Sequence, residues 1–431
     1  QKEPFSSSML IKNITLVNPD GLQKEQDILV QGGKIEKIGK GLICPGAQVI
    51  DGTGKTAFPG LIDMHVHLRE PGYEYKEDIT SGSKAAVKGG FTAVACMPNT
   101  DPVNDNKATL SYIKQRAQET DLCHVYPICA ITKNLMSQEL TEMATLQSMG
   151  AVAFSDDGRP VTNSKMMRNA LLYAKDIDAL LISHCEDLEL RGDGVVSEGL
   201  AATTYGLRVI PKAAEEVAVA RDILIAEDCG AKIHVAHVST KGSIELIRQA
   251  KKRGVRVTAE TAPHYFSAND SMIGSYDTST KVNPPLRGQE DVEAVIEGLM
   301  DGTIDAIATD HAPHHVDDKE IEYDLAAFGI SGIEMALSLA ITKLYETGKL
   351  DLPAIAQKMS AAPADILGVP GGRLQEGMPA DITLADLHQS YVVKREDIVS
   401  KGKNCPYIGW ELKGVITHTI VGGQIKYERE K

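Results

Sequence analysis

The sequence predicts an α/β fold: a (β/α)8 TIM-like barrel with a small flanking β-sandwich domain formed by both chain ends. Short apolar segments alternate with longer helical patterns through the middle of the chain, as in parallel barrels. At both ends, strand-like segments follow one another with little helix between them. No G-x-G-x-x-G motif follows the first central strand, which argues against an open doubly wound sheet. We expect the β domain to comprise residues 9–56 and 372–431, and the barrel residues 57–371.

The two chain ends contain the strands of the expected β domain. Near the N-terminus, apolar runs at residues 9–17, 27–30 and 35–38 are separated by turn signals. This unit is too short to bury a core of its own. We therefore expect it to join the C-terminal strand patterns at residues 381–385, 415–421 and 424–427. Because the chain opens on Gln1 and its first methionine is Met9, residues 1–8 are excluded from the fold prediction.

Eight strand patterns form the expected barrel. They lie at residues 61–66, 92–97, 125–130, 151–154, 180–184, 232–238, 255–260 and 304–309. The clearest helical patterns between them lie at residues 79–88, 108–119, 213–226, 243–252 and 290–299. Catalytic groups of such barrels lie at the C-terminal ends of the strands, so we expect the functional residues there.

Composition restricts the partners and the compartment. The chain has 431 residues and a formal net charge of −14, which argues against nucleic acid or an anionic membrane as the main partner. The seven cysteines form no C-x-x-C pair, and their number is odd, so a reducing compartment fits better than a disulfide framework. No apolar run reaches the ~20 residues of a membrane helix, and no signal-peptide pattern is present. We expect a cytoplasmic protein.

Histidines and aspartates stand at the ends of several predicted strands. His65 and His67 end the first strand and share one face, because side chains at i and i+2 of a strand point the same way. Two imidazoles on one face make half a zinc site. Three further strands end in His184, His237 and Asp310, so all five groups are expected to meet at the barrel mouth.

Two positions in this set are ambiguous by periodicity. His234 and His237 are three apart and face opposite sides of a regular strand, so only one enters the mouth. We choose His237 because it is nearer the C-terminal end, and expect His234 to be packed and hydrogen-bonded. Two metals need a bridging anion, and Asp156 and Asp157 both follow a predicted strand. Periodicity leaves the choice between them open, and the other would cap the next helix or the loop.

These residues resemble the metal-dependent amidohydrolase superfamily, and within it the type I dihydroorotases. The segments that are similar to dihydroorotase signatures are His67–Gly72, Met97–Thr100, Asn283–Arg287 and Thr309–His314. The resemblance extends from residues 51–55 to residues 377–381, nearly the whole chain.

The resemblance implies a ligand set and a cofactor. Two zinc ions per subunit would be held by His65, His67, Asp157, His184, His237 and Asp310, with Asp157 as the bridging ligand. Hydantoinase-like relatives carry a carboxylated lysine at the bridging position. No lysine lies between Ala151 and Gly158, so the chain departs from that branch. Zinc itself is a prior expectation, because histidine-rich sites accept several divalent ions.

The resemblance also implies the reaction, the reversible interconversion of N-carbamoyl-L-aspartate and dihydroorotate in pyrimidine synthesis. A zinc pair lowers the pKa of water toward ~7 and polarises the amide carbonyl, and Asp310 is expected to act as general acid and base. Arg69 can bind the substrate carboxylate through its planar fork. Family resemblance adds His67, Asn99 and His314 as further substrate contacts. It places Asn283 and the backbone of Phe328 and Gly329 at the ring amides.

Several alternatives stay open. Another cyclic amidohydrolase, such as a hydantoinase, dihydropyrimidinase or allantoinase, would share the barrel and metals but not need Arg69 and Asn99 arranged for a carboxylate. An inactive scaffold for a transcarbamoylase should have lost ligands, and every ligand position is filled here. The polar segment 314–328 fits either a mobile lid or a static solvated loop. We expect a homodimer, and aspartate transcarbamoylase is a candidate partner.

Overall fold

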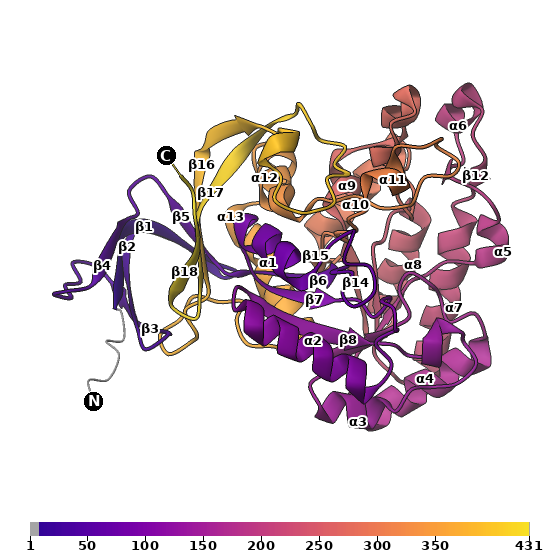
Figure 1. Cartoon of the computed structure of the whole chain (residues 1–431), viewed down its shortest axis with the longest axis horizontal. Coiled ribbons are helices and arrows are strands. Elements are labelled where there is room, and N and C mark those ends of the chain that lie inside the picture. The colour runs from indigo at the N-terminus through magenta and orange to yellow at the C-terminus, as the bar shows by residue number, and fades with distance from the viewer. Residues whose placement is uncertain (1–7, 431) are drawn as a thin grey trace.

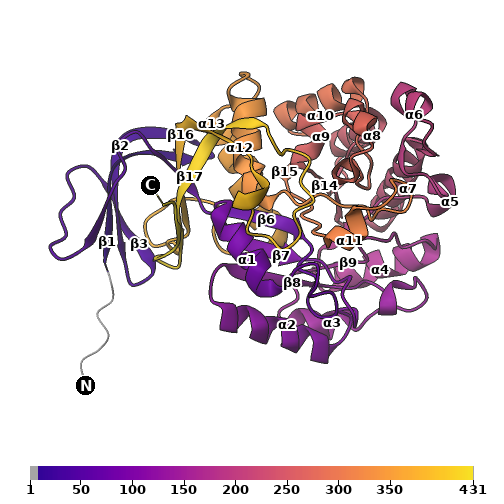
Figure 2. The same ribbon diagram turned by 45° about the horizontal axis from the view of Figure 1, so that its top comes forward.

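The central part of the chain folds into a barrel of eight parallel strands surrounded by helices (Figures 1 and 2). The structure is a computed structural model that describes residues 8–430. The barrel strands, in sheet order, are β6 (Leu61–Val66), β7 (Phe91–Cys96), β8 (His124–Cys129), β9 (Ala153–Ser155), β10 (Leu181–Ser183), β13 (Ile233–Val235), β14 (Val257–Thr261) and β15 (Ala306–Ile307). Strands β6 and β7 are buried on both faces, which is why their sequences read as continuous apolar runs. The predicted parallel barrel is confirmed.

The barrel closes between its first and last strands. Val66 pairs in parallel with His311, and the backbone N–H of His67 donates to the carbonyl of His311 at 2.9 Å. One apolar cluster fills the barrel interior, with Ile62, Met64 and Ile182 among its fully buried members. Because the interior is packed with side chains, ligands can reach the barrel only at its ends.

Helices cover the outside of the barrel (Figure 2). They are α1 (Ile79–Lys88), α2 (Lys107–Thr120), α3 (Met143–Ser148), α4 (Ser164–Asp176), α5 (Leu188–Arg191), α6 (Leu200–Tyr205), α7 (Ala213–Cys229), α8 (Lys241–Lys252), α9 (Pro263–Ser267), α10 (Gln289–Asp301), α11 (Val316–Lys319), α12 (Ala336–Ala340), α13 (Leu352–Ala356) and α14 (Ala362–Leu367). Several of them begin at side-chain caps. Asp78 forms a capping box with Ser81 at α1, and Thr240 accepts from the N–H of Ser243 at α8.

Strands from both chain ends form a separate sheet (Figure 1). Its members are β1 (Met9–Asn18), β2 (Gly21–Gln31), β3 (Lys34–Gly39), β4 (Gln48–Asp51), β5 (Thr56–Pro59), β16 (Ile382–Val392), β17 (Glu411–Val421) and β18 (Gln424–Glu428). Pairing of β5 with both β1 and β16 joins the N-terminal and C-terminal strands. An apolar cluster including Ile11, Ile28 and Ile382 lies within this sheet, so neither chain end needs a core of its own.

The chain passes from this sheet to the barrel at Gly60. Its N–H donates to the carbonyl of Asp381 at 2.8 Å, and a Cβ at this position would meet Oγ1 of Thr92 at 2.2 Å. Only glycine fits such a close approach. We propose the division into a β domain of residues 9–56 and 372–431 and a barrel of residues 57–371, with the passage between the two sheets at Gly60. A short pair, β11 (Val196–Ser197) and β12 (Val209–Ile210), forms a third sheet outside the barrel. Within residues 8–430, no helix is long and apolar enough to cross a membrane.

Candidate active site

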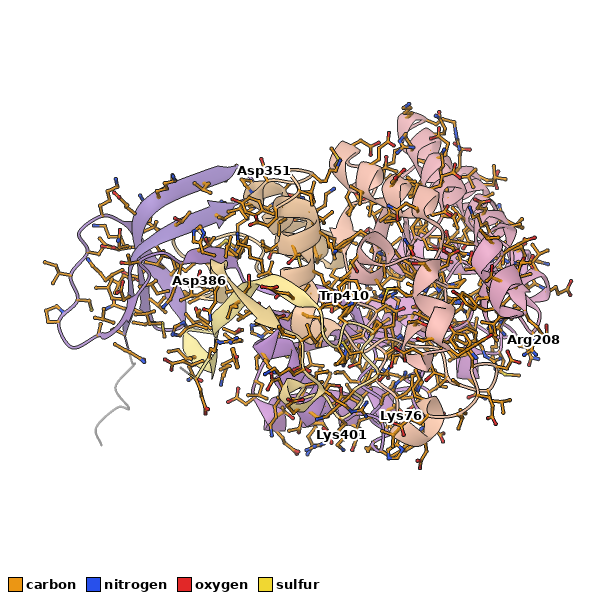
Figure 3. All side chains as sticks on the ribbon, turned by 90° about the horizontal axis from the view of Figure 1, so that it is seen from above. Lys76, Arg208, Asp351, Asp386, Lys401 and Trp410 are labelled. Carbon is orange, nitrogen blue, oxygen red and sulfur yellow. The ribbon has the colours of Figure 1, made fainter. Side chains whose placement is uncertain are left out.

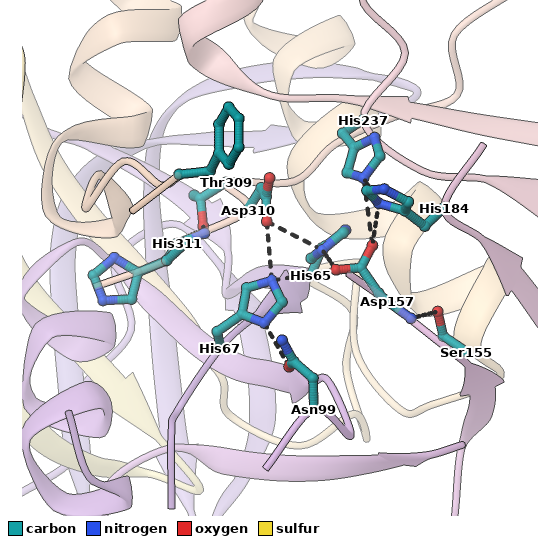
Figure 4. Close-up of polar contacts among 12 residues, drawn as sticks. His65, His67, Asn99, Ser155, Asp157, His184, His237, Thr309, Asp310 and His311 are labelled. Carbon is teal, nitrogen blue, oxygen red and sulfur yellow. Dashed lines mark hydrogen bonds and ion pairs between the residues drawn. The ribbon is translucent and has the colours of Figure 1, made fainter. Parts of the chain in front are cut away.

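Four side chains from three strand ends converge at the barrel mouth (Figure 4). Nε2 of His65 lies 3.3 Å from Oδ2 of Asp157 and 3.2 Å from Oδ1 of Asp310. Nε2 of His67 lies 3.4 Å and 3.1 Å from the same two oxygens. All four residues are buried, so the donor atoms face one another and not solvent. We call these residues the first ligand group.

A second ligand group shares one residue with the first. Oδ1 of Asp157 lies 3.2 Å from Nδ1 of His184 and 3.3 Å from Nε2 of His237 (Figure 4). The two oxygens of Asp157 therefore point into different groups, Oδ2 into the first and Oδ1 into the second. A carboxylate in this position can bridge two cations.

Local backbone geometry directs these side chains into the mouth. His65 lies in β6, and His184 directly follows β10. His237 and Asp310 lie beyond the ends of β13 and β15, with φ angles of 36° and 50°. Such left-handed angles are strained for non-glycine residues and persist only where the surroundings enforce them. Because β13 ends at Val235, strand alternation does not decide which way His237 points.

Asp156 and His234, the alternatives to Asp157 and His237, have partners outside the two ligand groups. Asp156 accepts hydrogen bonds from the N–H groups of Ile131 and Thr132 at 2.8 and 3.0 Å and from the Thr132 hydroxyl. Burial raises the pKa of Asp156 to about 6. Nδ1 of His234 lies 2.7 Å from Oγ1 of Thr258. Asp157 and His237, not Asp156 and His234, are thus the members of the two ligand groups.

Polar residues outside the two groups orient the histidines. Glu260 has one oxygen 3.3 Å from Nδ1 of His65 and the other 3.1 Å from Nε2 of His234. Glu186 lies 3.2 Å from Nε2 of His184. Carboxylates that hold the second nitrogen of a ligating histidine fix its tautomer and increase its basicity. Sequence reasoning missed both glutamates, although Glu186 lies two residues after His184 and Glu260 lies on β14.

Asn99 orients His67 and also faces the cavity. Its Oδ1 lies 2.8 Å from Nδ1 of His67 (Figure 4). An amide oxygen only accepts, so Nδ1 carries the proton and the lone pair of Nε2 is directed at the first ligand group. The amide nitrogen of Asn99 is then available to a molecule in the cavity.

The electrostatics of the cluster favour a cation. Burial alone would lower the pKa of His184, but hydrogen bonds to Asp157 and Glu186 outweigh it and raise that pKa to about 10. Burial would raise the pKa of Asp310, and His65 and His67 instead hold it well below its usual range. Imidazole nitrogens and carboxylate oxygens are the ligands that zinc and similar divalent ions prefer. The residues present therefore fit a metal centre.

A cavity of about 180 Å³ opens above the cluster. Its walls include every residue for which the sequence predicts a substrate contact, together with Arg191 and Val282, which the sequence analysis did not single out. The predicted wall residues are His67, Arg69, Asn99, Asn283, His314, Phe328 and Gly329. The same cavity is lined by Asp157, His184, His237 and Asp310, so a bound molecule would contact both the cluster and the predicted substrate residues.

Arg69 points its guanidinium into this cavity and has no competing carboxylate. Its Nε donates to the carbonyl of Pro313 at 3.1 Å, and within residues 8–430 it forms no salt bridge. The neighbouring Glu70 pairs with Arg116 at 3.0 Å, and Glu74 accepts from the N–H of Gly72. Burial lowers the pKa of Arg69 to about 10, so the group stays cationic at neutral pH. An unpaired buried cation of this kind favours an anionic ligand.

Buried lysines anchor the polar segment 314–328. Nζ of Lys319 donates to the carbonyls of Thr278, Lys281 and Ala327 at 2.8, 3.0 and 2.6 Å. Nζ of Lys281 donates to the carbonyls of Tyr323 and Asp324 and lies 4.6 Å from the ring centroid of Phe328. These contacts attach the segment to the loop at residues 278–281.

Comparison with known proteins agrees with this geometry. A family model described as dihydro-orotase-like matches residues 54–243. A dihydroorotase of Geobacter metallireducens is 52% identical over 98% of this chain and 100% of its own length, and one of Geobacter sulfurreducens is 53% identical with the same coverage. Among solved structures, an L-hydantoinase (dihydropyrimidinase) from Arthrobacter aurescens superposes with a TM-score of 0.89 at 26% identity, covering 99% of this chain and 97% of its own.

The barrel and its buried histidine–aspartate cluster define the class of metal-dependent amidohydrolases that act on cyclic amides. Aspartate, not lysine, occupies the position between the two ligand groups. With this site and full-length identity of about half, the chain belongs to the dihydroorotase family. It is a hydrolase of cyclic amide bonds.

Proposed function

We propose that this chain catalyses the reversible cyclisation of N-carbamoyl-L-aspartate to (S)-dihydroorotate and water in de novo pyrimidine (UMP) synthesis, using two zinc ions per subunit. One observation supports the proposal most strongly. A carboxylate shared by two ligand groups lies in the same cavity as an unpaired arginine. The first feature suits hydrolysis of an amide, and the second suits a substrate that carries a carboxylate.

The ligand roles follow from the two groups. His65, His67, Asp157 and Asp310 would hold one ion, and Asp157, His184 and His237 the other. The bound ions would supply an acidified water and a polarised amide carbonyl at neutral pH. Glu186 and Asn99 hydrogen-bond to His184 and His67 and would keep their other nitrogens aimed at the ions, as outer hydrogen bonds do in other metal sites. The Glu260 carboxylate lies 3.3 Å from Nδ1 of His65 and favours a proton on that nitrogen.

Asp310 is the proposed general acid and base. Its Oδ1 faces His65 and His67, while the residue also lines the cavity, which leaves Oδ2 to meet the substrate. In hydrolysis, Oδ2 takes the proton of the attacking water and passes it to the ring nitrogen as the C–N bond breaks.

The cavity wall offers donors and acceptors for the rest of the substrate. Arg69, Asn99 and His314 would bind the carboxylate. Nδ2 of Asn283 donates to Oε2 of Glu186 at 2.6 Å, so its Oδ1 can accept from a ring N–H. The backbone of Gly329 lines the cavity. A Cβ there would meet the carbonyl oxygen of Ala312 at 2.6 Å and the His314 ring at 2.9 Å.

A substrate panel tests the proposal. The purified holoenzyme would be assayed with L-dihydroorotate, carbamoyl-aspartate, hydantoin, dihydrouracil and allantoin, and its metal counted before and after chelation. We expect turnover of the first two compounds with about two ions per chain, lost on chelation and restored by zinc. Preference for hydantoin or dihydrouracil would overturn the substrate assignment. Full metal content without turnover of any compound would support an inactive scaffold.

The assembly and the cellular location of the chain are also part of the proposal. We propose a homodimer, because two-fold dimers are the commonest soluble oligomers, with aspartate transcarbamoylase as a candidate partner. Light scattering of the protein alone and mixed with the transcarbamoylase would test both. All seven cysteines are free and six are buried, which suits the proposed cytoplasmic location.

A further inference from the structure

His314 has a different partner on each ring nitrogen. Nζ of Lys76 lies 2.9 Å from its Nδ1. On the other side of the ring, Nε2 lies 2.8 Å from the carbonyl oxygen of Phe328 and 3.3 Å from Nη2 of Arg69. The ring is 7% exposed, so these partners decide its protonation with little competition from water.

Only one tautomer satisfies these contacts. An ammonium group donates and cannot accept, so Nδ1 of His314 must offer its lone pair to Lys76. Nε2 then carries the proton and donates to the carbonyl of Phe328. The opposite tautomer would turn an N–H toward the protons of Lys76 and leave the Phe328 carbonyl without this donor. Burial, with the charges of Arg69 and Lys76, holds the pKa of His314 well below its ordinary value, so the ring is neutral.

The tautomer creates a site for an anionic oxygen. With the proton on Nε2, this atom and Nη2 of Arg69 are both donors, 3.3 Å apart on the cavity wall. The Nε2–H donates to the carbonyl of Phe328 in this structure, so a substrate carboxylate would accept this proton in place of that carbonyl. Two donors cannot hydrogen-bond each other, but they can converge on one oxygen of a carboxylate. With the proton on Nδ1, Nε2 of His314 would instead present a lone pair. It would then accept from Arg69 and compete with the substrate carboxylate for that donor.

Lys76 is held in place from several sides. Its Nζ lies 5.9 Å and 5.6 Å from the ring centroids of Tyr73 and Tyr75, and 3.4 Å from Oδ2 of Asp318 on α11. Its side chain is 14% exposed. Figure 3 shows Lys76 on the barrel, away from the terminal sheet. Lys76 is not among the residues that line the cavity, so any effect on substrate passes through His314.

We propose that Lys76 is a positioning residue that fixes His314 as the neutral Nε2–H tautomer and thereby completes, with Arg69, the binding site for the substrate carboxylate. The last part rests on the proposed function. Sequence reasoning named Arg69 and His314 but had no reason to select Lys76, which follows Arg69 by seven residues in a loop.

Nitrogen NMR of the zinc-loaded enzyme tests the tautomer directly. Protein labelled with ¹⁵N-histidine would be compared as wild type, Lys76→Met and Lys76→Arg, with His314→Gln used to assign the signals. We expect the Nε2–H pattern for His314 in the wild type and in Lys76→Arg. In Lys76→Met we expect Nδ1–H or a mixture of tautomers. An unchanged Nε2–H pattern in Lys76→Met would overturn the proposal.

Kinetics test the consequence for binding. Loss of one hydrogen bond in a charged site corresponds to roughly tenfold in affinity, so Lys76→Met should raise KM for dihydroorotate about tenfold with kcat within about twofold. Lys76→Arg should restore most of the loss. The exposed Lys241→Met is the matched control and should behave as wild type. If the NMR pattern shifts but KM does not, and His314→Gln also leaves KM unchanged, the tautomer assignment stands. The role of His314 in the proposed function would then fail.

Discussion

Nδ1 of His184 lies 2.9 Å from Nε2 of His237, and both nitrogens face the same oxygen of Asp157. Two imidazole nitrogens can be this close only if one donates a proton to the other, or if both direct their lone pairs at a cation. The burial of all three residues removes water as an alternative partner. Metal binding at this group therefore requires loss of a proton and becomes stronger as pH rises.

Asp157 and Asp156 provide a matched pair of substitutions. Asp157→Asn replaces one of the two oxygens by an amide nitrogen, which cannot act as a ligand. We expect it to lose about one ion per chain and to lower kcat by roughly a hundredfold or more, the cost of removing one electrostatic group from an active site. Asp156→Asn keeps an oxygen for the N–H groups of Ile131 and Thr132 and should retain both ions. Elemental analysis and steady-state kinetics measure both. Equal metal content in the two variants would contradict the bridging role.

Arg69 tests carboxylate recognition. Arg69→Lys keeps the positive charge but loses the planar fork that reaches Pro313 and the cavity together. Charge-assisted hydrogen bonds contribute about 1.5–3 kcal/mol. KM for dihydroorotate should therefore rise between about tenfold and a hundredfold, with a smaller effect on kcat. Glu74→Gln, a change outside the cavity, serves as the control. A KM for Arg69→Lys equal to that of the wild type would exclude a direct contact with the substrate.

Lys319 should stabilise the loop over residues 314–328. Lys319→Met removes three hydrogen bonds and leaves the Ala327 carbonyl without its donor, while the carbonyls of Thr278 and Lys281 still accept from backbone N–H groups. The cost in the free energy of unfolding should be about 1–3 kcal/mol. Amides of this loop should exchange faster with solvent deuterium than in the wild type. The exposed Lys241→Met should change stability by no more than about 0.5 kcal/mol. Hydrogen-exchange mass spectrometry and urea unfolding give both quantities, and unaltered exchange in this loop would show that Lys319 does not anchor it.

An ion pair between the barrel and the terminal sheet predicts a pH effect. Nε2 of His124, on β8, lies 3.2 Å from Oδ2 of Asp381, and Oδ1 of Asp381 accepts from the N–H of Gly422. The hydrogen bond to Asp381 raises the pKa of His124 above its usual 6.5. The folded state then binds the proton more tightly than the unfolded state. The stabilisation is thus complete below pH 6.5 and disappears as pH rises through the folded pKa.

Thermal unfolding between about pH 5 and 9 measures this effect. Because the His124 side chain is 41% exposed, the stabilisation should be small, below about 1 kcal/mol. We expect the difference in Tm between the wild type and His124→Gln to shrink as pH rises. A difference that grows with pH would mean that the pair is not charged in the folded protein.

Strand positions were predictable from sequence because each buried strand has its own continuous run of apolar residues. Helix α1 begins and ends where its pattern and the Asp78 cap indicate, and β6 coincides with its apolar run. The ligand types at strand ends were also readable, since parallel strands all end at the same side of a barrel. The predicted strand at residues 232–238 was too long. It ends at Val235, because the chain turns at His237 with a positive φ that no apolar pattern records.

The sequence by itself determined the barrel, the terminal strands and the kinds of side chain at the strand ends. The reason is that the type and spacing of residues along the chain indicate which side chains are buried away from water. Only the tertiary structure decided which oxygen of Asp157 meets which histidine, and that Glu260, Glu186 and Lys76 support His65, His184 and His314. Two of these contacts, Glu260 with His65 and Lys76 with His314, join residues far apart in the chain, so they depend on how whole strands and loops pack. Hydrogen bonds require distances near 3 Å and fixed directions. Lys76 and His314 are 238 residues apart in the sequence, and that separation specifies neither a distance nor a direction.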